Sequence, residues 1–369
     1  MSLEKLRQRL SQLDRELLRL ASERQAVVEE IGQEKRGKGI PTRDFEREKE
    51  VLQHARSVAT EYGLPPDLAE ALLRLLIQSS LTTQEHARVS ESAFGSGKRA
   101  LVIGGAGRIG RWFVEFLASQ GFTVQVADPY GGVQGFPHLE DWRASPLDQD
   151  LIVVATPLRI TASILSELAG RRPAGLVFDV GSLKTPLREG LEALRAAGCR
   201  VTSLHPMFGP DTELLSGRHV IFVDLGVPEA TREAKELFTP TMALQVDMGL
   251  DDHDRLIAYV LGLSHALNIA FFTALAESGE ARVKLAQLSS TTFDSQLDVA
   301  SKVASENPHL YFEIQSLNQH TRGPLAALEE AVQRLRALVE GGDELGFVNL
   351  MNQGRDYLAA RTASDERRG

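Results

Sequence analysis

The sequence predicts several domains: an all-α N-terminal domain, a central α/β domain with a doubly wound, mostly parallel sheet, and an all-α C-terminal domain. Leucines recur every three or four residues near the start, which is typical of a long packed helix. From about residue 98, short apolar strands alternate with helices, and after about Asp247 only helical sequence follows. At 369 residues the chain is long enough for two or three domains. We place them at 1–93, 98–247 and 248–369.

Composition narrows the class of protein. A net charge of −9 argues against a nucleic-acid binder that works by neutralising phosphates. The single cysteine, Cys199, excludes an intramolecular disulfide, and nothing in the sequence indicates a metal site. The N-terminus lacks the pattern of a signal peptide, and we expect no apolar stretch long enough to span a bilayer. These features predict a cytoplasmic protein.

The N-terminal segment is predicted to contain three helices. The first is long and ends near Gly37, the second covers about 43–62, and the third begins at Asp67 with Glu70 as a capping box. The first helix carries an apolar seam of the coiled-coil kind, formed by Leu3, Leu6, Leu10, Leu13, Leu17 and Leu20. Because so few helices bury little apolar surface alone, we expect this segment to dimerise.

The central domain follows a small, polar linker at 94–98. Its predicted strands cover residues 99–103, 123–127, 151–155, 176–179, 200–203 and 219–224. The intervening helical stretches include 111–119, 160–168 and 187–197.

A glycine-rich turn directly follows the first strand. Gly105, Gly107 and Gly110 fit the G-x-G-x-x-G spacing, in which the glycines permit a tight turn, close approach to pyrophosphate and helix–strand packing. Asp128 ends the next strand, where its carboxylate can accept hydrogen bonds from the ribose of NAD and would repel a 2′-phosphate. The alternative is a purely structural turn. The context predicts a Rossmann-like NAD site formed by Gly105, Gly107, Arg108, Ile109, Gly110 and Asp128.

Two further strand ends carry chemically useful side chains. One bears Ser182, and the other begins the run His205-Pro206-Met207-Phe208-Gly209-Pro210. Ligands of such sheets bind beyond the carboxyl ends of the strands. Histidine is well suited to accept a hydroxyl proton near neutral pH, as removal of hydride from an alcohol carbon requires. A lone histidine is more often a solvated or hydrogen-bonded residue, so chemistry alone leaves its role open.

This run, with the glycine turn and Gly181-Ser182 at their spacings, resembles prephenate dehydrogenases from about Lys98 into the C-terminal helices. The resemblance implies that His205 takes the ring hydroxyl proton of prephenate, that Ser182 is its partner, and that hydride passes to NAD. Loss of CO2 then yields 4-hydroxyphenylpyruvate. It also implies pairing of C-terminal helices in a homodimer.

The C-terminal helices contain further positions of that family. His253, in the run Asp251-Asp252-His253-Asp254, is expected near the prephenate site, and His265 follows twelve residues later. Lys302 stands where an arginine that grips a substrate carboxylate is expected. A lysine can hold a carboxylate but lacks the planar fork of arginine. A solvated surface lysine is the alternative.

The N-terminal helices carry polar residues at helical spacing. Arg24 and Lys35 are eleven residues apart and share a face, as do Asp44 and Glu48. Each residue alone is explained by a solvated helix surface. Together the segment from Leu6 to Gln84 resembles the all-helical chorismate mutases, and the matching positions are Arg7, Arg24, Lys35, Asp44, Arg47, Glu48, Ser80 and Gln84.

That resemblance implies a pericyclic rearrangement that needs cations and hydrogen-bond donors rather than a nucleophile. Arg24 and a partner subunit's Arg7 would hold carboxylates, Lys35 and Gln84 would address the ether oxygen, and Glu48 would hold the ring hydroxyl. Asp44 and Arg47 would support them.

The two resemblances support each other, because a mutase makes the prephenate that the dehydrogenase consumes. The sequence therefore predicts a bifunctional enzyme of tyrosine biosynthesis acting on chorismate and prephenate. One alternative is an arogenate dehydrogenase; another makes the N-terminal helices only a dimerisation or regulatory module. Tyrosine feedback is a hypothesis from pathway position alone.

Overall fold

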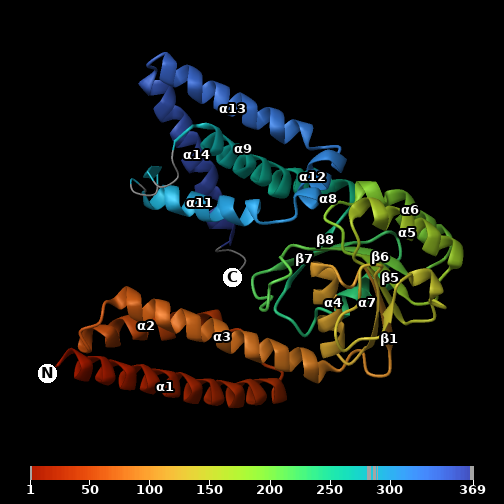
Figure 1. Cartoon of the computed structure of the whole chain (residues 1–369), viewed down its shortest axis with the longest axis horizontal. Helices are drawn as coiled ribbons and strands as arrows, with labels where there is room; N and C mark the ends of the chain where they lie inside the picture. The colour runs from red at the N-terminus through yellow and green to blue at the C-terminus, as the bar shows by residue number, and fades with distance from the viewer. Residues whose placement is uncertain (1, 281–283, 286–287, 289, 366–369) are drawn as a thin grey trace. The chain divides into compact units, whose positions relative to one another are not determined.

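The computed structural model describes residues 2–280, 284–285, 288 and 290–365 (Figure 1). The chain forms two compact units in which segments distant in sequence come together. The first comprises Met1–Val153, Pro206–Ile221 and Arg232–Val246, and the second comprises Val154–His205, Phe222–Thr231 and Asp247–Gly369. The central α/β sequence thus contributes to both units.

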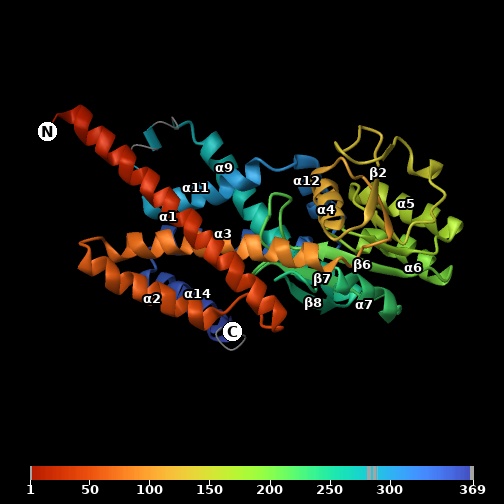
Figure 2. The same ribbon diagram turned by 90° about the horizontal axis from the view of Figure 1, so that it is seen from below.

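Three helices form the N-terminal segment, as predicted: α1 (Leu3–Gly37), α2 (Phe45–Glu61) and α3 (Pro66–Ser92). Figure 2 shows α1 crossing the antiparallel pair of α2 and α3. Asp44 caps α2 by accepting a hydrogen bond from the Arg47 backbone N–H at 2.9 Å.

The predicted capping box at Asp67 and Glu70 is wrong. Helix α3 begins one residue earlier, after Pro65, and has no side-chain cap. Both carboxylates instead form ion pairs with Arg56 of α2, each at 2.7 Å. A proline can begin a helix without a cap because it has no N–H to satisfy, which frees the two acids for the neighbouring helix.

The leucine seam of α1 remains exposed. The exposed fractions range from 47% at Leu13 to 64% at Leu3 along the seam. A row of exposed leucines on one long helix is typical of a surface that another helix covers.

One eight-stranded sheet forms the centre of the α/β sequence, with strand order β3-β2-β1-β4-β5-β6-β7-β8. The six predicted strands are confirmed, three with the predicted bounds and three within three residues at their ends: β1 (Arg99–Ile103), β2 (Thr123–Ala127), β4 (Leu151–Val154), β5 (Leu176–Asp179), β6 (Val201–Pro206) and β7 (His219–Val223). Two strands, β3 (His138–Leu139) and β8 (Leu244–Met248), were not predicted. The first is too short and the second too polar to give an apolar run.

Helices pack on this sheet. Helix α4 (Arg108–Ser119) contacts β1 and β2, and α5 (Leu158–Arg171) packs against α6 (Arg188–Ala196). A further helix, α7 (Pro228–Glu236), was not predicted. Strands β1, β4 and β5 are almost entirely buried, as in parallel sheets covered on both faces.

The C-terminal region is helical, as expected. It contains α8 (Leu250–Ile257), the π-helical turn η3 (Ala258–Leu263), α9 (Ser264–Glu277), α11 (Thr291–Ala304), α12 (Pro308–Leu317), α13 (Arg322–Glu340) and α14 (Glu344–Asp365). Figure 1 shows α9, α11, α13 and α14 gathered into one bundle.

The continuous helical stretch Leu250–Glu277 is more apolar than expected. By length and composition alone it could cross a membrane, which no segment was predicted to do, and 22% of its apolar window is buried. One such stretch among the described residues is weak evidence for a membrane span, since the core helix of a soluble bundle meets the same criteria.

Candidate active sites

The glycine turn has the geometry that a dinucleotide needs. A Cβ at Gly110 would lie 2.0 Å from the carbonyl oxygen of Gly104, and one at Gly105 would lie 2.8 Å from the Val126 side chain. Helix α4 begins directly after Gly107, and no side chain caps it. Its first N–H groups can therefore receive an anion, and the turn fits the pyrophosphate of NAD.

Asp128 is positioned beside this turn. One carboxylate oxygen accepts a hydrogen bond from the Ala106 N–H at 3.1 Å, and the other accepts one from the Tyr130 N–H at 3.0 Å. Arg108, which could have reached a 2′-phosphate, instead pairs with Asp211 at 2.7 Å. The residues thus favour NAD over its phosphorylated form.

A buried polar cluster occupies the carboxyl ends of β5 and β6. Asp179 pairs with Ser203 in the parallel register and accepts the hydroxyl hydrogen bond of that serine. The ammonium group of Lys184, which is fully buried, donates to Asp179 and to the carbonyl oxygens of Gly181 and Leu204. A buried lysine needs such partners, because an unpaired internal charge is very costly.

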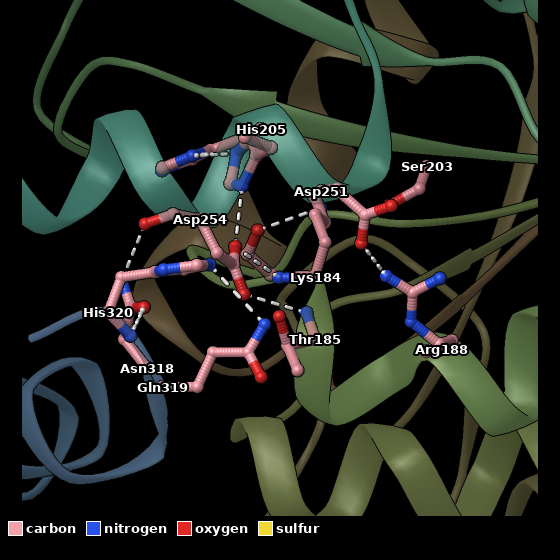
Figure 3. Close-up of polar contacts among 12 residues, drawn as sticks. Lys184, Thr185, Arg188, Ser203, His205, Asp251, Asp254, Asn318, Gln319 and His320 are labelled. Carbon is pink, nitrogen blue, oxygen red and sulfur yellow. Dashed lines mark hydrogen bonds and ion pairs between the residues drawn. The ribbon is translucent and has the colours of Figure 1, made fainter.

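His205 belongs to this cluster and lies within β6, which runs past its predicted end. Its Nδ1 atom is 2.9 Å from Nε2 of His253 on α8, and Nδ1 of His253 is 2.7 Å from the Asp254 carboxylate. That carboxylate also accepts the backbone N–H groups of Lys184 and Thr185 (Figure 3). The three side chains form one buried hydrogen-bonded chain.

Burial determines the protonation of this chain. Burial, reinforced by the charge of Lys184 and by repulsion from His253 whenever that ring is protonated, holds the pKa of His205 well below its ordinary value of 6.5. Burial also lowers the pKa of His253, although Asp254 opposes this. For Asp254, burial acts to raise the pKa, but hydrogen bonds from His253, Thr185 and Lys184 outweigh it and lower the pKa. At neutral pH the site therefore holds two neutral imidazoles and a carboxylate.

The other predicted residues of this site make fewer contacts. Ser182 is half-buried, and its hydroxyl has no hydrogen-bond partner among the described residues. Lys302 lies exposed on α11, and its ammonium group forms no ion pair within the part of the chain that the structure describes. The roles expected of both stay predictions.

His265, a further position expected from the resemblance to the dehydrogenases, is mostly buried. Its ring stacks on that of Tyr311 with centroids 4.0 Å apart, and Nδ1 is buried without a partner among the described residues. Burial lowers its pKa to about 4.

A second site lies in the N-terminal helices, where a pocket of about 310 Å³ opens between α1, α2 and α3. Seven of the eight predicted mutase residues line it, namely Arg24, Lys35, Asp44, Arg47, Glu48, Ser80 and Gln84. Arg7 lies exposed on α1 and does not line this pocket, so its expected role towards a partner subunit stays a prediction.

Hydrogen bonds hold several of these side chains in place. Arg24 donates to the hydroxyl of Ser80 at 2.8 Å, and Lys35 donates to the carbonyl of Thr42 at 3.0 Å. Gln84 donates to the carbonyl of Val28 on α1 at 3.1 Å. Helical spacing brings each residue to a face, and the packing of three helices brings the faces together.

Sequence reasoning missed Arg43, which contacts a residue of this pocket, and Glu85, which follows Gln84 in the chain. Arg43 holds Glu48 with two hydrogen bonds of 2.9 Å and also donates to the hydroxyl of Ser216. Glu85 is only 2% exposed and accepts the backbone N–H groups of Leu215 and Met242. The only sequence feature that could have pointed to Glu85 is that it directly follows Gln84. Its partners are 130 and 157 residues away, and no local pattern identifies them.

The fold and the two sites define a class: a nucleotide-dependent dehydrogenase joined to a helical domain whose pocket suits a charged substrate. Family models match in the same order, with chorismate mutase type II at residues 6–85, the nucleotide-binding domain of prephenate dehydrogenase at 139–244 and its dimerization domain at 250–353. The chain belongs to the prephenate dehydrogenase family and carries a chorismate mutase domain in front of it.

Similar proteins and solved structures agree with this family assignment. A T-protein of Enterobacter agglomerans is 29% identical over 355 residues, covering 94% of this chain and 91% of the relative. A 4-amino-4-deoxyprephenate dehydrogenase of Streptomyces pristinaespiralis is 31% identical over 293 residues, covering 75% and 95%. The fold resembles that of prephenate dehydrogenase from A. aeolicus, solved with hydroxyphenyl propionate and NAD+, with a TM-score of 0.56 and 17% identity over 71% of this chain and 97% of that one.

The chain is therefore a bifunctional enzyme of tyrosine biosynthesis, with chorismate mutase and NAD-dependent prephenate dehydrogenase activities. Its dimerisation domain supports a homodimer.

Proposed function

We propose that His205 is the proton acceptor of the dehydrogenase and that the pocket between α1, α2 and α3 is the mutase site. The observation that carries the first assignment is the buried, neutral imidazole at the end of β6, hydrogen-bonded through Nδ1. Its Nε2 atom has no hydrogen-bond partner among the described residues and can accept a proton. The seven converging polar residues carry the second.

In the dehydrogenase, His205 takes the ring hydroxyl proton of prephenate as the carbon bearing that hydroxyl loses hydride. The glycine turn and Asp128 would hold NAD, which would supply the hydride acceptor. Loss of the ring carboxylate as CO2 then aromatises the product to 4-hydroxyphenylpyruvate. Ser182 orients the imidazole or the hydroxyl, and Lys302 is the candidate cation for a substrate carboxylate.

In the mutase, the protein holds a flexible dicarboxylate in its reactive conformation. Arg24 of one subunit and Arg7 of its partner bind the carboxylates. Lys35 and Gln84 donate to the ether oxygen as charge builds on it, and Glu48, held by Arg43, accepts from the ring hydroxyl. Electrostatic stabilisation at the breaking bond accelerates the rearrangement without a proton relay.

The substrate preference, the cellular location and the regulation of the enzyme each have a separate basis. The attached mutase favours prephenate over arogenate, because it supplies prephenate directly. We assign the enzyme to the cytoplasm, since one cysteine and an acidic composition suit that compartment. Inhibition of either activity by tyrosine is expected from pathway position, and unchanged rates in its presence would dismiss that expectation.

A paired assay on the full chain tests the function. Chorismate loss is followed without NAD, and NADH formation is then followed with prephenate alone and with arogenate. We expect both chorismate loss and NADH formation, with prephenate preferred. NADH formation without chorismate loss would reduce the N-terminal helices to a dimerisation or regulatory module.

Two variants separate the sites, and each is the control for the other. Arg24→Met should reduce mutase turnover by roughly 10²-fold and leave dehydrogenation unchanged, because the cation that holds a substrate carboxylate in the reactive conformation is lost. His205→Asn should reduce hydride transfer by roughly 10²–10⁴-fold and leave mutase turnover and NAD binding unchanged. Full activity of either variant in its own reaction would refute that assignment.

A further inference from the structure

We propose that His253 and Asp254 are positioning residues of the dehydrogenase, which fix the tautomer of His205 and take up the positive charge created when His205 accepts a proton. This inference rests on the proposed role of His205. It gives His253 a role different from the substrate contact expected from the sequence, because its ring is fully buried and hydrogen-bonded at both nitrogens.

The chain of hydrogen bonds starts at a rigid acceptor. The Asp254 oxygens accept the backbone N–H groups of Lys184 at 2.8 Å and Thr185 at 2.7 Å. The backbone carbonyl of Asp254 accepts the side-chain amide of Asn318 at 2.8 Å. The ion pair of Arg188 with Asp251 also ties α8 to the segment after β5 (Figure 3). Asp254 therefore cannot turn away from His253.

A fixed carboxylate determines both tautomers. A carboxylate only accepts, so Nδ1 of a neutral His253 must donate to Asp254 and its Nε2 must accept. The atom facing that Nε2 is Nδ1 of His205, which must then carry the proton. In the resulting tautomer, Nε2 of His205 holds the lone pair that accepts the substrate proton. The same logic orients the imidazole in Ser-His-Asp triads.

The surrounding charges favour moving the proton onward. His205 is 4% exposed, and the buried ammonium of Lys184 disfavours a second cation beside it. Lys184 acts in the same direction on His253, but His253 has the Asp254 carboxylate at 2.7 Å, which favours its protonated form. Of the other charged groups, Asp179 is already paired with Lys184 at 2.8 Å. On α8 itself, Asp251 and Asp252 are paired with arginines.

The proton step balances within these groups. The O–H bond of the prephenate hydroxyl breaks as the hydride leaves its carbon for NAD, and a proton adds to Nε2 of His205. The Nδ1 proton of His205 then moves to Nε2 of His253. The imidazolium of His253 lies beside the Asp254 carboxylate, and the reverse shift restores His205 when it releases its Nε2 proton to solvent.

The variant His253→Gln separates charge uptake from simple orientation. A glutamine can accept from His205 and donate to Asp254, but it cannot take a proton. We expect kcat of dehydrogenation to fall about 10–100-fold, with KM for prephenate and mutase turnover within about threefold of wild type. His320→Gln, on the linker between α12 and α13, is the matched control and should leave kcat unchanged. A wild-type kcat in His253→Gln overturns the proposal.

The variant Asp254→Asn tests the charge. Without the carboxylate, His205 should be harder to protonate, so the acid limb of kcat/KM should move to lower pH while kcat falls. An unmoved limb overturns the proposal. Because Asp254 also holds two backbone N–H groups, this variant can lose its fold, and His253→Gln then decides alone. If His205→Asn is inactive while both variants behave as wild type, only this inference fails; a fully active His205→Asn removes the proposed function as well.

Discussion

At the scale of single residues, sterics and charge explain most of the nucleotide site. Gly110 is required because any Cβ would collide with the Gly104 carbonyl, 2.0 Å away. Asp128 combines a structural role, accepting the Ala106 and Tyr130 N–H groups, with a carboxylate beside the turn. Both features follow from local sequence, which is why the pattern predicts them.

Asp128→Ser should weaken the preference for NAD. The variant loses an acceptor for the ribose hydroxyls and the repulsion of a 2′-phosphate, so KM for NAD should rise about 10-fold or more while KM for NADP falls. Steady-state kinetics with both cofactors provide the measurement. Asp148→Ser, an exposed acid paired with Arg99, is the control. An unaltered cofactor preference would show that Asp128 stabilises the turn but does not select the cofactor.

His265 should make the protein sensitive to acid. Its pKa is lowered to about 4 in the folded protein, against about 6.5 unfolded, so the unfolded chain binds more protons between these values. The stability present above pH 6.5 is therefore lost as the pH falls towards 4. On going from pH 7 to pH 5, His265→Gln should lose roughly 2–4 °C less in melting temperature than wild type.

The control for this measurement is His309→Gln, an exposed histidine on α12, whose acid sensitivity should equal that of the wild type. If His265→Gln lost as much melting temperature as the wild type between pH 7 and pH 5, other groups would be responsible for the acid sensitivity.

At the scale of elements, helix α8 completes the dehydrogenase site. It brings His253 to His205 of β6, 48 residues away in sequence, and Asp254 to Lys184 just after β5, 70 residues away. The sequence places these residues on one helix and the strand ends at one edge of a sheet. It does not specify which helix face meets which strand, because that depends on packing of apolar surfaces distant in the chain.

Helix α3 also holds a segment distant in sequence through Glu85. Glu85→Ala would leave the buried N–H groups of Leu215 and Met242 without their acceptor, and each unsatisfied donor costs about 1–3 kcal/mol. We expect a melting temperature lower by several degrees and faster proteolysis near residues 210–217. The control is Glu91→Ala, which removes an exposed acid of α3 that pairs with Arg36 of α1. It should change the free energy of unfolding by less than about 1 kcal/mol. Equal losses of stability in the two variants would show that the hydrogen bonds of Glu85 do not stabilise this segment.

At the scale of the whole molecule, exposed apolar faces indicate association of subunits. Besides the α1 seam, helices α13 and α14 expose Val332, Leu335, Val339, Leu345, Phe347, Val348 and Met351. These residues lie within the region that matches the dimerization domain. An isolated subunit would leave both faces in water, which is unusual for a stable monomer.

The double variant Leu10→Glu/Leu17→Glu on the α1 seam should impair the mutase activity but not the dehydrogenase activity. Both leucines are 59% exposed, and a partner's Arg7 can reach the pocket only if α1 pairs with another subunit. We expect mutase turnover to fall at least 10-fold with dehydrogenation retained. Gln12→Glu, exposed on the same helix but outside the seam, should leave both activities unchanged. Normal mutase turnover in the double variant would mean that the pocket is complete within one subunit.

The eight mutase positions were expected from a resemblance to the chorismate mutases and stay predictions. The sequence by itself determined the order of the helical, α/β and helical regions, the six strands, and the glycine turn with Asp128. These depend on periodicity and short-range spacing, which a single chain displays directly. Only the tertiary structure decided that His253 faces His205 rather than solvent, that Arg43 holds Glu48, and that Asp67 pairs with Arg56. Such contacts join residues through packing, and the free energy of burying a charge or a ring depends on neighbours that no local pattern specifies.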